Sequence, residues 1–186
     1  MKYLYKIIAI VIATSLSACG SVRKISDLDP KTGYLPTDKT AKVVLSRPID
    51  LDAHRELLLV PTGEFVKGQL QKIGYFGELM TLDDLQTRIV KANLTDKVPT
   101  IQDKIGVASA AKYYKHFLWF RYEGKGQGNN QQGRYVLTDP ATMEDYFIAE
   151  TDLDFVWAGV NDQRNWYPMF NSFIDYIKSN SRAYKQ

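Results

Sequence analysis

The chain has 186 residues, with 24 Lys and Arg against 21 Asp and Glu, and 45% of its residues are apolar. The formal net charge of +3 includes Lys2 and Lys6, so the remainder of the chain is almost neutral. A balanced charge gives no electrostatic basis for binding nucleic acid, and this length and apolar content suit one domain with a substantial core.

The N-terminus has three zones that are typical of a secretory signal peptide. Residues 1–6 carry two lysines, residues 7–13 form an unbroken apolar run, and residues 14–18 are small and mildly polar. The apolar run is much shorter than the ~20 residues that a membrane-spanning helix needs. We therefore expect residues 1–18 to be removed as a signal, leaving a mature chain without a transmembrane segment.

The single cysteine of the chain, Cys19, follows this signal directly. Leu16-Ser17-Ala18-Cys19 resembles the lipobox of bacterial lipoproteins. The resemblance implies a diacylglycerol on the Cys19 sulfur, cleavage before it, and acylation of the new amino terminus by a chain such as palmitate. Three acyl chains would anchor the protein stably in a lipid bilayer. Since Gly20 stands where an Asp would favour the inner membrane in such lipoproteins, we expect the periplasmic face of the outer membrane.

Polar and turn-forming residues follow, and the regular elements begin near residue 41. We expect residues 19–40 to comprise the lipidated cysteine and a flexible tether, and residues 41–186 to form one periplasmic domain. Short apolar runs predict strands at 43–45 and 57–60, the second buried on both faces. The next predicted elements are an amphipathic helix that Gly74 and Gly77 end, a strand at 78–81, and a helix capped by Thr81.

The second half of the domain is predicted to hold a third helix, three strands and a closing helix. The third helix is expected to begin near Thr100, with Ile101, Ile105 and Ala108 on one face. Strands are predicted at 116–122, 134–138 and 146–157, with a turn at 139–142 between the last two. Apolar residues at helical spacing then predict a final helix: Phe170, Phe173, Ile174 and Ile177. This order predicts a single-domain α/β sandwich of one mixed sheet with packed helices, a C-terminal antiparallel meander and a closing helix.

Residues 55–155 are similar to periplasmic lipoproteins of envelope assembly, such as curli-secretion-channel lipoproteins and activators of penicillin-binding proteins. The similarity is carried by Ile73-Gly74-Tyr75-Phe76-Gly77, by Ala110-Ala111-Lys112-Tyr113-Tyr114 running into a strand, and by the strand-turn-strand at 137–148. It implies a protein that supports assembly or transport in the envelope. The long apolar insertion with which channel formers build a pore is missing.

Familiar catalytic and metal-binding patterns are not found in the sequence. The glycine-rich segment 124–133 lies between two predicted strands, which favours a hairpin loop over a phosphate-binding loop. His54 and His116 lack the spacing of a zinc site, and no G-x-S-x-G motif or second cysteine exists. We expect no metal, no cofactor and no enzymatic activity.

Carboxylates are the remaining catalytic candidates. Glu150, Asp152 and Asp154 alternate along one predicted strand and so share a face, where two of them could form a glycosidase pair. The same alternation is typical of a half-exposed strand, and we favour that interpretation. A carboxylate-dependent hydrolase of cell-wall glycan stays as an alternative.

Aromatic and polar residues gather in 154–173, which is the most distinctive segment of the chain. They could form a binding surface for a protein or a polymer, or they could fasten the last helix to the sheet. The partner-binding candidates are Trp157, Asn161, Asp162, Arg164, Trp166 and Tyr167. The predicted function is a non-catalytic lipoprotein that binds an envelope protein or polymer; a self-associating structural subunit, joined through its sheet edges, is a further alternative.

Overall fold

The fold was examined in a computed structural model, which describes residues 25–127, 131–153, 155–156, 159–160 and 162–184. Within these ranges no helix is both long and apolar enough to cross a membrane. The predicted signal peptide and Cys19 lie outside the described residues.

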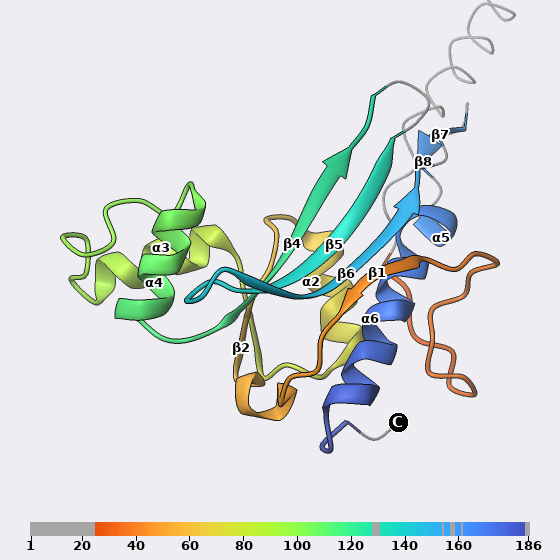
Figure 1. Cartoon of the computed structure of the whole chain (residues 1–186), viewed down its shortest axis with the longest axis horizontal. Coiled ribbons are helices and arrows are strands. Elements are labelled where there is room, and N and C mark those ends of the chain that lie inside the picture. Colours follow the sequence, from red (N-terminus) through yellow and green to blue (C-terminus); the bar gives the residue numbers. More distant parts are fainter. Residues whose placement is uncertain (1–24, 128–130, 154, 157–158, 161, 185–186) are drawn as a thin grey trace, which may run out of the picture.

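One six-stranded mixed sheet organises the domain (Figure 1). Its strands are β1 (Lys42–Ser46), β2 (Leu57–Leu59), β3 (Glu78–Met80), β4 (Leu118–Lys125), β5 (Gln132–Asp139) and β6 (Glu144–Asp152). They are ordered β1-β6-β5-β4-β2-β3, with β2 parallel to β3 and β4 and the other pairs antiparallel. The predicted fold class, a mixed sheet with a β4-β5-β6 meander, is confirmed.

The larger helices pack in two separate apolar clusters. The helices are the short 3₁₀ helix η1 (Leu51–His54), α2 (Glu64–Ile73), α3 (Leu82–Lys91), α4 (Lys104–Tyr113), α5 (Asp162–Asn165) and α6 (Tyr167–Asn180). Helices α2 and α6 pack on the β4-β5-β6 part of the sheet, whereas α3 and α4 gather at the β2-β3 end (Figure 1). Leu58 faces the first cluster, and Leu57 and Leu59 face the second. Strand β2 is therefore buried on both faces, as predicted.

Local signals in the sequence account for several helix ends. Gly74 ends α2 with a left-handed φ of 69°, a conformation that costs glycine little. Thr81 and Asp84 form a reciprocal capping box at the start of α3, in which each side chain accepts a hydrogen bond from the backbone N–H of the other residue. Both features agree with the predictions from the sequence.

Helix α4 begins later than expected. Its N-cap is Asp103, whose carboxylate accepts a hydrogen bond from the Gly106 N–H at 2.7 Å. The chain before the helix passes so close to Gly106 that a Cβ there would lie 2.0 Å from the Thr100 carbonyl oxygen. This start makes the predicted face wrong: Ile101 is buried ahead of the helix, whereas Ile105 on the helix is 77% exposed.

Strand β6 ends earlier than the predicted strand 146–157. Its last residue, Asp152, pairs with Gln132, the first residue of β5, so no neighbouring strand continues beyond that point. A small separate hairpin of β7 (Phe155–Val156) and β8 (Gly159–Val160) follows.

Residues 25–41 lie along α2 and α6, which differs from the tether expected over residues 19–40. Two side-chain amides hold the segment by its backbone, each bonding both the N–H and the C=O of one residue. Gln69 binds Ser26 at 3.1 and 2.9 Å, and Asn171 binds Leu35 at 2.8 and 2.9 Å. The Leu35 side chain, 2% exposed, completes the attachment by joining the core. The many turn residues of this segment predict a flexible tether. The two amides bind its backbone and not its side chains, so the composition of the segment gives no sign of the attachment.

Asp52 in η1 ties the C-terminal residues to the domain. Its carboxylate accepts hydrogen bonds from the hydroxyls of Ser181 and Tyr75 and from the backbone N–H groups of Arg182 and Ala183. These donors, with Ser181 first, lower the pKa of Asp52 from 3.8 to about 2. Because the pKa is lower in the folded state, the carboxylate stabilises the fold above pH ~4, and this contribution is lost as the pH falls toward about 2.

The Asp52→Asn variant is expected to melt at a lower temperature than the wild type at pH 7. Between pH 4 and 2 its melting temperature should fall less, because the variant has no Asp52 carboxylate to protonate. Thermal unfolding followed by circular dichroism across this interval measures both effects. Asp96→Asn, at an exposed position, is the control and should follow the wild type. An equal fall in melting temperature between pH 4 and 2 for Asp52→Asn and the wild type would contradict the stabilising role of the Asp52 carboxylate.

Candidate partner-binding surface

The aromatic residues predicted as a binding surface are largely inside the molecule. Trp166 and Tyr167 are buried, and the Trp166 ring lies 5.1 Å from that of Tyr122 on β4. The Tyr167 hydroxyl lies 2.6 Å from the Ser26 hydroxyl. These two residues fasten the start of α6 to the sheet and to the N-terminal segment, so they do not form an exposed aromatic surface.

The other predicted partner-binding residues are only partly described. Arg164 lies on α5, where its guanidinium Nε is 3.6 Å from the Asp38 carboxylate of the N-terminal segment. Asp162 begins α5. Trp157 and Asn161 lie outside the described residues. Among the described members of this set, Trp166 and Tyr167 are buried and Arg164 lies beside the N-terminal segment.

The predicted carboxylate row lies on the sheet face opposite α6 and lines a groove of about 270 Å³. Arg134 Nη2 lies 2.9 Å from one oxygen of Glu150, and Lys42 Nζ lies 3.3 Å from the other. The Gln132 amide donates to Asp152 at 2.8 Å, and Asp154 is outside the described residues. Each carboxylate oxygen of Glu150 is thus held by a cation of a neighbouring strand, and this pairing favours a structural role.

A second ion-pair network lies on the same sheet face. Arg121 binds Asp145 at 2.9 Å and Thr138 at 3.1 Å, and it also pairs with Glu123. Its guanidinium carbon lies 5.6 Å from the centre of the Trp119 ring. These contacts join neighbouring strands of the sheet, so they favour a structural role for Arg121.

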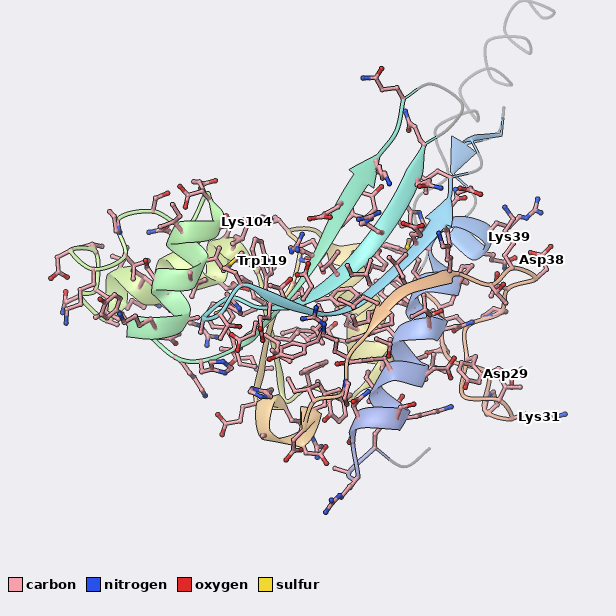
Figure 2. The ribbon with its side chains drawn as sticks, in the orientation of Figure 1. Asp29, Lys31, Asp38, Lys39, Lys104 and Trp119 are labelled. Carbon is pink, nitrogen blue, oxygen red and sulfur yellow. The ribbon has the colours of Figure 1, made fainter. Side chains whose placement is uncertain are left out.

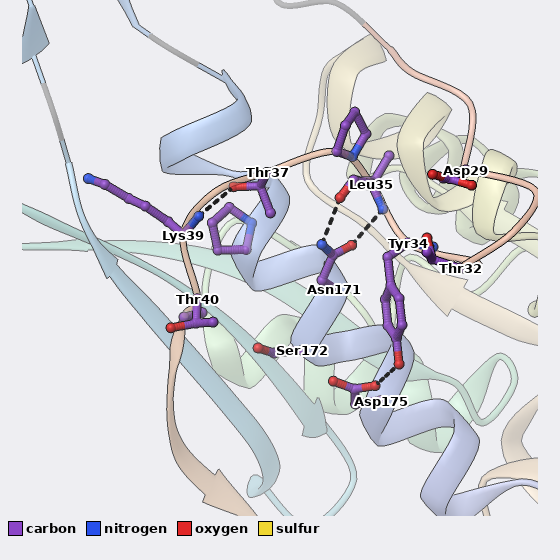
Figure 3. Close-up of a pocket in the computed structure, with 13 residues that line it drawn as sticks. Asp29, Thr32, Tyr34, Leu35, Thr37, Lys39, Thr40, Asn171, Ser172 and Asp175 are labelled. Atoms are coloured by element: carbon purple, nitrogen blue, oxygen red, sulfur yellow. Dashed lines mark hydrogen bonds between the residues drawn. The ribbon is translucent and has the colours of Figure 1, made fainter.

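The N-terminal segment and α6 form a groove of about 450 Å³ with a mixed polar and apolar lining (Figure 3). The amide of Asn171 holds Leu35 at its centre, and the Tyr34 hydroxyl donates to Asp175. Lys178 Nζ lies 4.1 Å from the centre of the Tyr34 ring. The contacts across this groove join the segment to the helix, so they attach residues 25–41 to the domain.

A largely apolar groove runs along α4, and we call it the α4 groove. It has a volume of about 570 Å³ and lies between α4 and the β5-β6 turn. Ile105, Tyr113 and Met143 line it and are 77%, 44% and 37% exposed. The small residues Ala108 and Ser109 also line the groove. An apolar surface exposed to solvent on a domain with a well-buried core is typical of a protein-binding site.

A polar cluster borders the α4 groove. His116, which lines the groove, lies 3.2 Å from Asp139, and its ring centre is 5.0 Å from that of His54. Burial, together with the nearby His116, lowers the pKa of His54. Within the described ranges, no group of three or more His, Cys, Asp or Glu is placed to hold a metal ion. The cluster supports the turn beside the groove, since Asp139 also accepts a hydrogen bond from the Ala141 N–H.

No protein-family model matches this chain, and no curated protein matches it. Two solved structures are similar to part of it. The C-terminal domain of LpoB from Salmonella enterica is 15% identical, covering 53% of this chain and 82% of its own, with a TM-score of 0.35. The C-terminal domain of LpoB from Escherichia coli is 14% identical, covering 62% of this chain and 84% of its own, with a TM-score of 0.35. A likeness at this TM-score supports no conclusion about the function of this chain.

The sequence motifs do not point to the α4 groove. A signal existed in residues 104–113, KIGVASAAKY, where apolar and small residues occur on nearly every side of the helix. Val107, Ala110 and Ala111 are buried against the sheet, which leaves Ile105 and Tyr113 on the outside. A helix at the surface normally places polar residues there. Met143 could not have been added from sequence, because only the folded turn brings it to α4.

Proposed function

We propose that this protein is a non-catalytic lipoprotein, anchored through acylated Cys19 at the periplasmic face of the outer membrane, that binds a protein partner in envelope assembly or transport. The observation that carries the proposal is the exposed apolar α4 groove. Specific protein interfaces combine an apolar centre with a polar rim, and the groove has both, with Lys104 and Lys112 at its edge.

The position of the groove relative to the N-terminal segment supports a partner in the periplasm. Figure 2 shows Lys104 at one end of the molecule and Asp29, Lys31, Asp38 and Lys39 at the opposite end. A lipid on Cys19 would hold the N-terminal end of the domain near the bilayer. The α4 groove would then face away from the membrane, where a periplasmic protein can reach it.

Pull-down of the full-length protein from cross-linked cells tests the proposal, with Ile105→Glu as the diagnostic variant. We expect an envelope protein to be recovered with the wild type and its recovery to fall at least about tenfold with Ile105→Glu, because the charge disrupts the apolar centre. Val90→Glu is the control, since Val90 is 53% exposed on α3 and does not line the groove. Equal recovery with Ile105→Glu and Val90→Glu would contradict the proposed surface.

The Cys19→Ser variant tests the anchor. Without the thiol, no thioether to diacylglycerol can form, so we expect membrane attachment to be lost and the precursor to stay uncleaved or to be mislocalised. Membrane fractionation and the mass of the N-terminal peptide measure this. A variant still cleaved before residue 19 and still in the outer membrane would remove the basis for the anchor.

Self-association is a second candidate function, which the β1 edge of the sheet favours. Val43 and Val44 are exposed there, and β1 pairs only with β6 among the described strands. An exposed apolar edge strand can pair with a second chain. A molecular mass in analytical ultracentrifugation that rises with protein concentration would support this alternative, and a constant monomer mass would exclude it over the range measured.

A further inference from the structure

We propose that the partner presents an acidic amphipathic helix to the α4 groove, an inference that rests on the proposed function. Three features carry this inference: the shape of the apolar surface, the lack of a hydrogen-bonding edge beside it, and the lysines at its rim.

The shape of the α4 groove suits a helix. Its centre is formed by the small residues Ala108 and Ser109, and larger side chains stand around them: Ile105, Tyr113 and Met143. Small residues allow a second helix to approach closely, and helices pack at ~8–10 Å between axes. Met143 adds an adaptable side chain, held in the β5-β6 turn at an unusual φ of 59°. Side chains at helical spacing on the partner could fill the hollows between these residues.

The backbone around the groove does not suit an extended peptide. The backbone groups of α4 bond along the helix, and at its ends the Gly106 N–H binds the Asp103 carboxylate and the Tyr114 N–H binds the Ala110 carbonyl. A partner strand would therefore leave its own backbone groups unsatisfied on this apolar surface, at a cost in free energy. A helix satisfies its backbone internally, so it can bury its apolar side here.

The charge at the rim selects an acidic partner. Lys104 and Lys112 line the groove, and within the described ranges neither is paired with a carboxylate. The neighbouring carboxylates are occupied: Asp103 caps α4, and Asp139 binds His116. The ammonium groups of Lys104 and Lys112 are therefore open to the carboxylates of a partner.

Tyr113 holds this positive charge in place. Lys97 Nζ and Lys112 Nζ lie 5.7 and 5.2 Å from the centre of its ring, so two ammonium groups flank one exposed aromatic residue. Such cation–π contacts position lysine heads beside apolar surface. A helix with an apolar side and acidic residues along its edges would contact the groove and the lysines together.

The experiment places a photo-reactive amino acid at position 109 of the full-length lipidated protein in intact cells. After illumination, mass spectrometry identifies the partner peptide joined to this position. The expected result is a segment with apolar residues at helical spacing and acidic residues beside them. A double variant, Lys104→Glu and Lys112→Glu, should reduce the adduct about tenfold, and the control Lys91→Glu should leave it unchanged.

A purified wild-type complex with the identified segment should weaken as the NaCl concentration rises, and the double variant should lose this dependence. Changing the acidic residues of the segment to lysine should restore binding to the double variant. The inference fails if position 109 captures a basic or extended segment, or a second copy of this chain. It also fails if position 109 captures nothing although the pull-down recovers a partner. In these cases the proposed function stands. If no partner is recovered by either method, both the inference and the proposed function fail.

Discussion

Replacing Phe173 by alanine is expected to destabilise the domain by about 3 to 5 kcal/mol. Phe173 lies on α6 and is fully buried, with its ring centre 4.7 Å from that of Phe120 on β4 and 5.5 Å from that of Phe147 on β6. It also contacts Phe76, which lies beyond α2. Removing the ring would leave a cavity at the point where α6 joins the sheet, and several aromatic neighbours cannot all move to fill it. Urea unfolding followed by circular dichroism measures the loss.

Ile105→Ala is the matched control, because it also truncates a large apolar residue on a helix. Ile105 is 77% exposed, so we expect its free energy of unfolding to change by no more than about 0.5 kcal/mol. The contrast separates residues that hold the fold from residues available for binding. A loss for Phe173→Ala below about 1 kcal/mol would contradict the packing of α6. A loss for Ile105→Ala as large as that for Phe173→Ala would show that the α4 groove belongs to the core.

Features set by local spacing could be predicted from the sequence. The apolar residues at 170, 173, 174 and 177 all lie on the buried side of α6, because helical periodicity alone places them together. Thr81 and Asp84 are three residues apart, the separation that a capping box requires. The turn after Asp139 formed as expected, since its carboxylate accepts the Ala141 N–H. In each case the partners are near neighbours in the chain.

Features made by distant residues could not be predicted in the same way. The α4 groove joins residues on α4 to Met143 in the β5-β6 turn, across β4 and β5. The attachment of residues 25–41 depends on Gln69 and Asn171, whose partners Ser26 and Leu35 lie 43 and 136 residues away in the chain. The polar turn before Trp166 predicts an exposed ring, but its contacts with Tyr122 and Tyr135 place the ring inside the domain.

The attachment of the N-terminal segment has a consequence for how far the domain can lie from a membrane. A free tether over residues 19–40 would span up to about 75 Å at full extension. Residues 25–41 are fixed on α2 and α6, so only residues 19–24 link Cys19 to the domain. Six residues span about 20 Å at most. If Cys19 is lipidated as proposed, the domain would be held close to the bilayer with the α4 groove at its far end.

The double variant Gln69→Leu and Asn171→Leu is expected to release this segment. Each amide makes two hydrogen bonds to the backbone, and each bond contributes about 1 kcal/mol net. Leucine is an apolar residue suited to the buried position of Gln69. The released population should therefore rise by well over about tenfold, since every ~1.4 kcal/mol changes the equilibrium by that factor. Limited trypsin digestion measures it as faster cleavage after Lys31 and Lys39, both within the segment.

Gln71→Leu is the control for this release, because Gln71 lies on the same helix but is exposed. The double variant should keep the wild-type circular dichroism spectrum, since β1–β6 and α6 do not depend on the two amides for their own backbone hydrogen bonds. Cleavage at the wild-type rate in a folded double variant would mean that burial of Leu35 holds the segment without the amides. Faster cleavage would instead show that the two amides hold the segment on the domain.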